Sequence, residues 1–335
     1  MDLISHALAG ALVAGAASPA PRPKGLLLAG ALAALMPDLD VLIRADGDPL
    51  LTLEYHRHFS HSLLLVPLLG LFASLIYRRV ARPALGLTRV WLALSLAVLS
   101  ADLLDWCTSY GVHLLWPMQE QRLALNIIAV VDPAMTLLLA LGLWGLLAAG
   151  QRAAWIGLVA GMTYLSIASA QQVRGEAAAR AWAAGEGVPV QRLLVKPTLG
   201  NILLWRAIVD DGARYHPLAL RIGMDTTDVR SGAAIAHWQA HAEPLPESLQ
   251  LALTRFERLS DGWLVRHPLD AAVVGDIRYA MLPDSNQPLW GLRLPEAGSG
   301  PVELVEFRDG SKAVREAFLD QLLGRAAVAS VTRAD

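Results

Sequence analysis

The sequence predicts a mainly α-helical membrane protein, a polytopic bundle of about six apolar segments followed by a soluble α+β domain. Three observations support this: the composition, the way charge is distributed, and a change of pattern near residue 171. The chain is 54% hydrophobic and 17% charged, against about 25% charged in an average soluble domain. Only ten of its 28 basic and ten of its 30 acidic residues precede residue 172. We therefore expect a transmembrane domain over residues 1–171 and a soluble domain over residues 172–335.

Six apolar segments fill the first domain, at residues 3–17, 25–43, 62–77, 90–104, 135–149 and 153–170. Several are shorter than the roughly 20 residues that a lone spanning helix needs, but six in succession favour a compact bundle in the bilayer. Small residues are dense in the first two segments, which is typical of membrane helices that approach each other closely. The alternative is a very apolar soluble helical domain.

The second domain shows the pattern of a small, sheet-rich fold. Residues 172–187 read as a helix leading out of the membrane, and residues 311–323 as a closing helix. Between them, Pro, Gly and Asp turns separate short strand-like stretches. These are residues 191–195, 203–209, 218–222, 262–265, 277–281 and 289–294.

Several classes of protein are excluded or lack support. The net charge of −2 gives no basic footprint for nucleic acid. A single cysteine, Cys107, excludes an internal disulfide, and the first residues lack the basic region of a cleavable signal peptide. No GxSxG, P-loop or GxGxxG motif supports a serine hydrolase, an NTPase or a dinucleotide-binding enzyme.

Basic residues in the short connections predict the orientation in the membrane. Seven follow the first, third and fifth segments, and three lie in the opposite connections. The first set is Arg22, Lys24, Arg78, Arg79, Arg82, Arg89 and Arg152, and the second is Arg44, Arg57 and Arg122. This distribution places the first set in the cytoplasm, and the N-terminus and the second domain on the periplasmic side.

Acidic and histidine side chains gather on that same outer side, although only Lys and Arg were used to derive the topology. They are Asp2, His6, Asp38, Asp40, His56, His58, His61, Asp102, Asp105 and Asp132. Ionisable groups at membrane depth are costly and are usually functional or paired with each other. Imidazole and carboxylate are normal ligands of a divalent ion such as zinc. The pattern predicts one metal site facing the periplasm.

Two motifs form the centre of this expected site. In PDLD, Pro37 loosens the helix, so Asp38 and Asp40 point to different sides, one toward metal and the other toward a histidine. The alternative is a helix end with solvated acids. In HRHFSHS, His56 and His61 are five residues apart, which favours a turn over a metal-binding helix. Histidines that are merely hydrogen-bonded are the alternative there, as they are for His6.

Five stretches resemble the YdjM family of bacterial inner-membrane proteins, which are predicted metal-dependent hydrolases. They are MDLISHALAG, ALMPDLDVL, HRHFSHSLL, LLDWCTSYGVHLLWP and ALNIIAVVDPAMTLLL. The resemblance covers residues 1–150 well and the remainder loosely, and the family usually has Gly where this chain has His58. It implies a location in the bacterial inner membrane. A more distant similarity of the PDxD, HRxxxHS and LLD pattern to zinc-dependent phospholipase C and helical nucleases implies phosphoester hydrolysis.

The sequence thus predicts a membrane-bound hydrolase that uses one or two divalent ions, most simply zinc. The expected metal ligands and their supporting residues are His6, Asp38, Asp40, His56, His61, Asp105 and Asp132, with Asp40 or Asp102 as general base. A site at headgroup level favours a phosphoester of a lipid or lipid-linked substrate. One alternative is a non-catalytic metal-binding or metal-transport protein. Another is a bundle that anchors the outer domain, with the polar cluster as a packing network.

Overall fold

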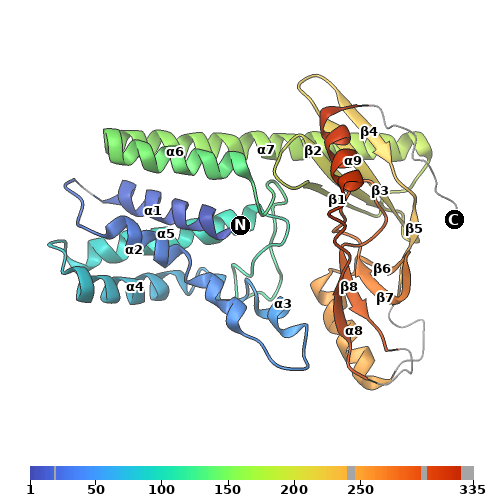
Figure 1. Ribbon diagram of the computed structural model, residues 1–335, viewed down its shortest axis with the longest axis horizontal. Helices are drawn as coiled ribbons and strands as arrows, with labels where there is room; N and C mark the ends of the chain where they lie inside the picture. Colours follow the sequence, from blue (N-terminus) through green and yellow to red (C-terminus); the bar gives the residue numbers. More distant parts are fainter. Residues whose placement is uncertain (19, 240–245, 296–299, 326–335) are drawn as a thin grey trace. The chain divides into compact units, whose positions relative to one another are not determined.

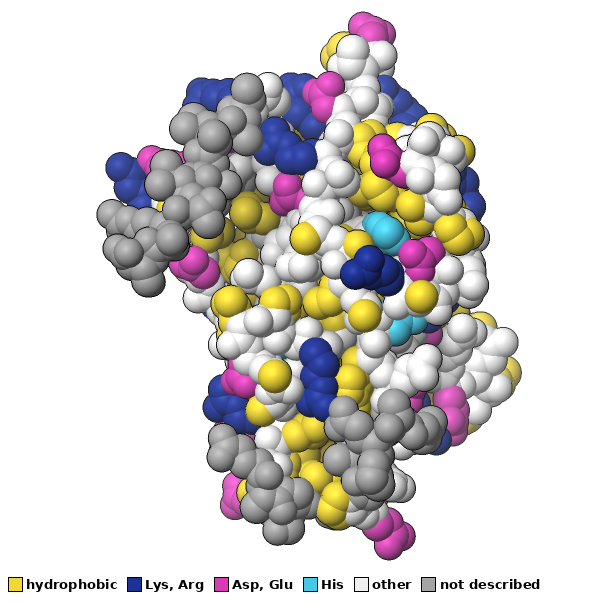
Figure 2. All heavy atoms as spheres, turned by 90° about the vertical axis from the view of Figure 1, so that its right-hand side faces the viewer, with side chains coloured by type: hydrophobic (Ala, Val, Ile, Leu, Met, Phe, Trp, Pro, Cys, Tyr) yellow, Lys and Arg dark blue, Asp and Glu magenta, His cyan; other side chains and the backbone are white. Residues whose placement is uncertain are grey.

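The computed structural model describes the whole chain except residues 19, 240–245, 296–299 and 326–335 (Figure 1). Two compact units are present, and each is described by itself. The first comprises Met1–Ile43, Glu54–Ala170 and Leu199–Asn201. The second comprises Arg44–Leu53, Gln171–Thr198 and Ile202–Asp335. On the face that Figure 2 shows, basic and acidic side chains are interspersed among apolar ones.

Each of the six apolar segments contains a helix. The helices are α1 (Leu3–Ala17), α2 (Leu26–Ala34), α4 (Val66–Ala81), α5 (Leu87–Cys107), α6 (Pro133–Ala149) and α7 (Gln151–Glu186). Shorter turns separate them, namely η1 (Pro37–Leu42), α3 (Leu51–Tyr55) and η2 (Phe59–His61). Helix α1 packs against α2, α5 and α6, and α4 packs against α5 (Figure 1).

The prediction of about six membrane spans is wrong. Among the described residues, only α5 and α7 are long and apolar enough to cross a bilayer. A third span is counted if the bent pair Leu51–His61 and Val66–Ala81 is taken as one. The remaining segments are too short, because α1 and α6 have 15 and 17 residues and α2 has nine. Helix α2 stops before Pro37, and the chain restarts there as a 3₁₀ turn, since proline restricts the residue before it and removes a backbone donor.

Small residues bring α1 and α2 into backbone contact, as their density in the sequence predicts. A Cβ atom at Gly10 would collide with the carbonyl oxygen of Gly30 and the Cβ of Ala34. A Cβ at Gly30 would likewise collide with the carbonyl oxygen of Gly10. The two helices can therefore pack this closely only while these positions have no side chain.

Gly10→Leu is expected to destabilise the first unit by about 1–3 kcal/mol or more, because overpacking forces the two helix backbones apart. Thermal unfolding in detergent measures this loss. Gly185→Leu on α7 is the matched control, since a Cβ there meets nothing within 4 Å. Equal losses in the two variants would contradict the close packing of α1 on α2.

The second unit contains two antiparallel sheets. The first has the order β1 (Arg192–Pro197), β2 (Leu204–Asp210), β3 (Arg214–Ile222) and β4 (Thr227–Ser231), with β5 (Ile235–Ala236) also pairing with β3. The second has the order β6 (Leu264–His267), β7 (Asp270–Asp276), β8 (Trp290–Arg293) and β9 (Glu303–Glu306). Two helices complete the unit, α8 (Glu247–Leu259) and α9 (Lys312–Leu323).

The first sheet lies between the C-terminal half of α7 and the second sheet. On one face Trp205 and Val209 pack with Ala179 and Ala183 of α7. On the other face Ile208 and Tyr215 pack with Trp263, Val265 and Ile277. The strand predicted at residues 277–281 is wrong, because the strand there is Asp270–Asp276 and the chain turns directly after it.

Candidate metal centre

Four separate elements of the first unit supply the polar cluster, namely α1, η1, η2 and α5. Asp2 caps α1 by accepting hydrogen bonds from the backbone N–H groups of Ile4 and Ser5, which fixes His6 in the first turns. In η1 the buried residues are Pro37, Asp38 and Asp40. Asp102 and Asp105 lie in the last turns of α5 and are fully buried. The ends of these helices thus bring carboxylate and imidazole side chains from distant parts of the sequence close together.

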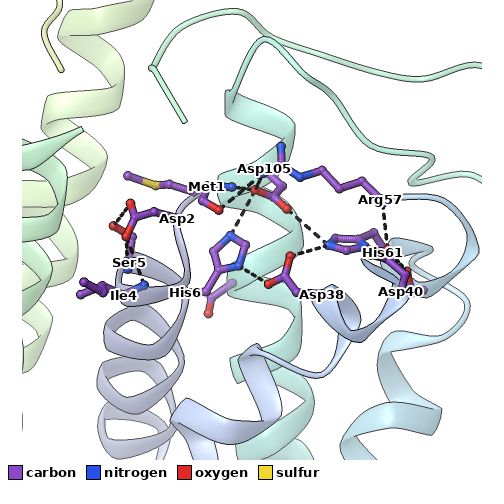
Figure 3. A network of polar contacts seen from close by, with 12 residues as sticks. Met1, Asp2, Ile4, Ser5, His6, Asp38, Asp40, Arg57, His61 and Asp105 are labelled. Carbon is purple, nitrogen blue, oxygen red and sulfur yellow. Dashed lines mark hydrogen bonds and ion pairs between the residues drawn. The ribbon is translucent and has the colours of Figure 1, made fainter. Parts of the chain in front are cut away.

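His6 lies between two carboxylates (Figure 3). Its Nδ1 is 2.8 Å from Asp38 Oδ2, and its Nε2 is 3.1 Å from Asp105 Oδ1. One potential ligand atom from each of these three residues lies within 4.8 Å of the other two, and all three residues are buried. This is the spacing that a divalent ion needs to draw three ligands together.

His61 joins the same group from η2. Its Nε2 is 3.7 Å from Asp38 Oδ1 and 3.3 Å from Asp105 Oδ2, and its side chain is fully buried (Figure 3). Within the described part of the chain, neither His61 Nε2 nor Asp105 Oδ2 makes a hydrogen bond, although both atoms are buried. Buried polar atoms are seldom left without a hydrogen bond, and these two lie 3.3 Å apart as an ion pair.

Asp40 holds the other side of His61. Its Oδ2 is 3.3 Å from His61 Nδ1 and accepts hydrogen bonds from Ser60 Oγ at 2.6 Å and the Arg57 backbone N–H at 2.8 Å. Its Oδ1 is 2.9 Å from His56 Nδ1. Burial alone would raise the pKa of Asp40, but hydrogen bonds from His56, His61 and Ser60 outweigh it and hold the pKa below its usual value. Asp40 is thus an ionised group that orients His61.

Arg57 is the basic side chain of the cluster and is 3% exposed. Its guanidinium lies 2.9 Å from Asp105 Oδ1 and donates to Thr108 Oγ1 at 3.0 Å. The N-terminal amine of Met1 also contacts Asp105. Arg57 has φ +60°, a left-handed conformation that is uncommon for residues other than glycine. This conformation lets one residue reach Asp40 through its backbone and Asp105 through its side chain.

Asp102 is fully buried, and neither of its carboxylate oxygens has a hydrogen-bond partner among the described residues. The charges of His61, Asp38 and Asp40 act on it, so it lies near the cluster on α5. A buried carboxylate without a partner requires a cation or a proton. Together with the unpartnered atoms of His61 and Asp105, Asp102 makes the set of donors fit a divalent cation.

The structure brings six of the seven predicted ligand or supporting residues together. They are His6, Asp38, Asp40, His56, His61 and Asp105. Within this set, His56 contacts only Asp40 among the acids described, and its side chain is 28% exposed. His56 therefore supports Asp40 and does not reach the group around His6.

Asp132 is not brought into the cluster. Its carboxylate accepts hydrogen bonds from the Met135 backbone N–H at 3.0 Å and from the Tyr164 hydroxyl at 2.8 and 3.0 Å. It is the N-cap of α6, directly before Pro133 at the first helical position. An acid before a proline predicts such a cap as readily as a metal ligand.

Asp132→Ala is accordingly expected to lower the free energy of unfolding by about 1–2 kcal/mol, because α6 loses its cap. The metal content of the purified protein should stay unchanged. Chemical denaturation combined with elemental analysis checks both parts. A loss of bound metal in this variant would instead return Asp132 to the ligand set.

Two further histidines form a separate pair. The rings of His58 and His113 are 4.3 Å apart, and Trp116 lies beside His58. His113 donates its backbone N–H to the carbonyl oxygen of Arg57 at 3.1 Å. The pair thus holds the turn that carries Arg57. Ser60 and Thr108, which contact Asp40 and Arg57, were not predicted as site residues, because a lone hydroxyl in a polar loop has no distinguishing pattern.

Comparison with known proteins finds similarity over the first half of the chain. The family model for YdjM inner membrane protein matches residues 1–175, just over half of the chain. Inner membrane protein YbcI of Escherichia coli (strain K12) is 40% identical over 102 residues, which are 30% of this chain and 58% of that protein. The aligned part is thus less than two thirds of YbcI, and no solved structure matches. The chain belongs to the YdjM inner membrane protein family.

Proposed function

We propose that this protein is a metal-dependent hydrolase of the bacterial inner membrane, with a divalent ion, most simply zinc, held by the buried cluster. The observation that carries the proposal is the group of buried His6, Asp38 and Asp105 ligand atoms, which lie within 4.8 Å of one another. The unpartnered Nε2 of His61 and the carboxylate of Asp102 adjoin this group. Imidazole and carboxylate ligands of this kind suit zinc.

A divalent ion at this position would supply Lewis acidity and make a water molecule nucleophilic near neutral pH. His6, Asp38, His61 and Asp105 would hold it. The chain's own contribution is orientation, because Asp40 fixes the His61 ring and Arg57 fixes the Asp105 carboxylate. Contacts of this kind fix the orientation of the residues that bind the metal and affect its affinity.

Asp102 is the better of the two candidate general bases. The carboxylate oxygens of Asp40 already accept from His56, Ser60 and the Arg57 backbone, which leaves that group little freedom to take up a proton. Both oxygens of Asp102 are without a hydrogen-bond partner. A base must have a free lone pair within reach of the proton it removes.

Exposed apolar side chains in and beside η1 and η2 favour a lipid or lipid-linked substrate. In η1 the exposed Leu39 lies between the buried Asp38 and Asp40, and Val41 and Leu42 after them are exposed. Leu63 and Leu64 are exposed directly after η2. A polar cluster next to exposed leucines suits a substrate whose reacting group lies at headgroup level. The class of bond that we propose is a phosphoester. The basic residues Arg78, Arg79, Arg82 and Arg89 lie at the end of α5 opposite to Asp105, which supports a periplasmic site.

The test is a headgroup-release screen with the full-length protein in lipid nanodiscs, after loading with zinc. We expect release of phosphate-bearing headgroups that a chelator abolishes and added zinc restores. Zinc binding without hydrolysis, together with ion uptake into proteoliposomes, would favour the metal-transport alternative. Unchanged stability and function after chelation would favour a packing network.

Arg57→Gly is expected to destabilise the metal-free protein strongly and the metal-loaded protein only slightly. Without the guanidinium, the buried Asp105 charge keeps, among the described residues, only the Met1 amine and the imidazoles beside it. Removing one partner of a buried ion pair costs about 3–5 kcal/mol, and a bound ion would replace the lost positive charge. Thermal unfolding with and without chelator measures the difference. Arg57→Ala is the matched comparison, expected to be less stable than Arg57→Gly by about 1 kcal/mol because of the left-handed backbone. Equal losses with and without metal would contradict the role given to Arg57.

A further inference from the structure

Two basic side chains are buried next to each other in the second unit, far in sequence from the metal centre. Lys196 on β1 and Arg206 on β2 are cross-strand partners, so their side chains leave the same face of the sheet. They are 8% and 3% exposed. Among the described residues, neither forms an ion pair with a carboxylate. Buried charges are normally paired, because desolvation is costly.

Neutral groups satisfy most of the Arg206 guanidinium. Nη1 donates to the carbonyl oxygens of Pro283 at 2.6 Å and Ser285 at 2.9 Å, and Nη2 donates to that of Ile277 at 2.7 Å. The Nε atom is buried and has no hydrogen-bond partner among the described residues. Carbonyl oxygens carry no net charge, and the two acids whose charges act on Arg206, Asp284 and Asp276, accept hydrogen bonds from Gln321 and Arg278 instead.

The acid nearest to Lys196 is already engaged. Asp276 accepts from the Arg278 guanidinium at 2.7 Å, and Lys196 Nζ instead lies 3.6 Å from the centre of the Tyr279 ring. Burial and the neighbouring Arg278 lower the pKa of Lys196 well below its ordinary value. The acid beside Lys196 is thus already paired with another cation.

We propose that Lys196 and Arg206 bind the phosphate group of an anionic ligand. The unpartnered Arg206 Nε and the Lys196 ammonium would supply two charge-assisted hydrogen bonds to phosphate oxygens, and the ligand would bring a negative charge into direct contact with both. Arg278 and Tyr279 beside them are only partly buried. The site lies outside residues 1–175 and is independent of the proposed hydrolase activity.

The first test uses the wild-type full-length chain in neutral detergent, with acylation of lysines by an amine-reactive ester followed by mass spectrometry. Lys24, Lys196 and Lys312 are the lysines of the sequence. Inorganic phosphate, compared with chloride at equal ionic strength, is expected to slow acylation of Lys196 severalfold, because a bound anion both covers and protonates the amine. Lys312, whose side chain is 83% exposed, is the internal control and should not change.

A second arm replaces inorganic phosphate with a short-chain phosphatidic acid. Protection by the lipid alone identifies a headgroup site, whereas protection by both identifies a site for the phosphate group itself. If neither ligand protects Lys196, the proposal is wrong, and the amine is a neutral group packed on Tyr279.

Thermal unfolding of variants provides an independent readout. Phosphate is expected to raise the Tm of wild type, Lys196→Arg and Asp38→Asn, and to have no effect on Lys196→Met. Asp38→Asn is included because phosphate could also bind at a metal centre, and the shift should survive that substitution. A Tm increase in Lys196→Met equal to that in wild type would overturn the proposal. If Lys196→Met fails to fold, the acylation experiment on wild type decides.

Discussion

Asp38→Asn is expected to lose the bound divalent ion and, with it, all metal-dependent activity. Asparagine keeps the shape of the side chain but removes the charge that lies between His6 and His61. Burial would raise the pKa of Asp38, yet the hydrogen bond from His6 and the adjacent His61 imidazole hold it well below its usual value, so the native group is an anion. Replacing a supporting residue of a metal site costs about 10–100-fold in affinity, and a direct ligand should cost more.

Isothermal titration of the chelator-treated protein with zinc measures this loss directly. Asp46→Asn is the matched control, because Asp46 is exposed in a loop and has the same chemistry. Zinc affinity in Asp38→Asn equal to that of the control would show that Asp38 is not a ligand.

Asp102→Asn is expected to keep the metal and to lower kcat. The carboxylate is fully buried and has no hydrogen-bond partner among the described residues, so replacing it breaks no hydrogen bond within the cluster. General acid–base catalysis typically contributes about 10²–10⁴-fold to a rate. We expect a loss in that range with little change in KM, since the group would act on the proton and not on substrate binding.

Steady-state kinetics on the substrate identified by headgroup release, with elemental analysis of the same samples, separate the two roles of Asp102. A variant that loses zinc in proportion to activity would make Asp102 a ligand. Full activity with full metal content would show that Asp102 is neither the general base nor a metal ligand.

The sequence predicted which elements carry the cluster more reliably than how many helices cross the membrane. All six apolar stretches contain helix, because hydrophobic composition and small residues determine that locally. Span number depends on where each helix stops, and α2 ends before Pro37 after nine residues. The mean hydropathy of residues 25–43 does not reveal that the helix ends inside this segment.

For the site, too, the sequence predicted some features and not others. His6, Asp38, His61 and Asp105 meet because they lie at helix ends, and the sequence predicted that these ends gather on one side of the bundle. Asp132 lies on the same side but caps α6, and position along the chain alone does not separate the two roles. The buried Lys196 and Arg206 pair arises from strand register, which a short strand-like stretch does not specify.

The account rests on the claim that the buried carboxylates and imidazoles of the first unit hold a divalent cation. The most direct test is elemental analysis of the full-length protein, purified in detergent without chelator and compared with the Asp38→Asn variant. We predict one or two zinc-like divalent ions per wild-type chain and none above background in the variant. The same low metal content in both proteins, even after incubation with zinc, would contradict the account.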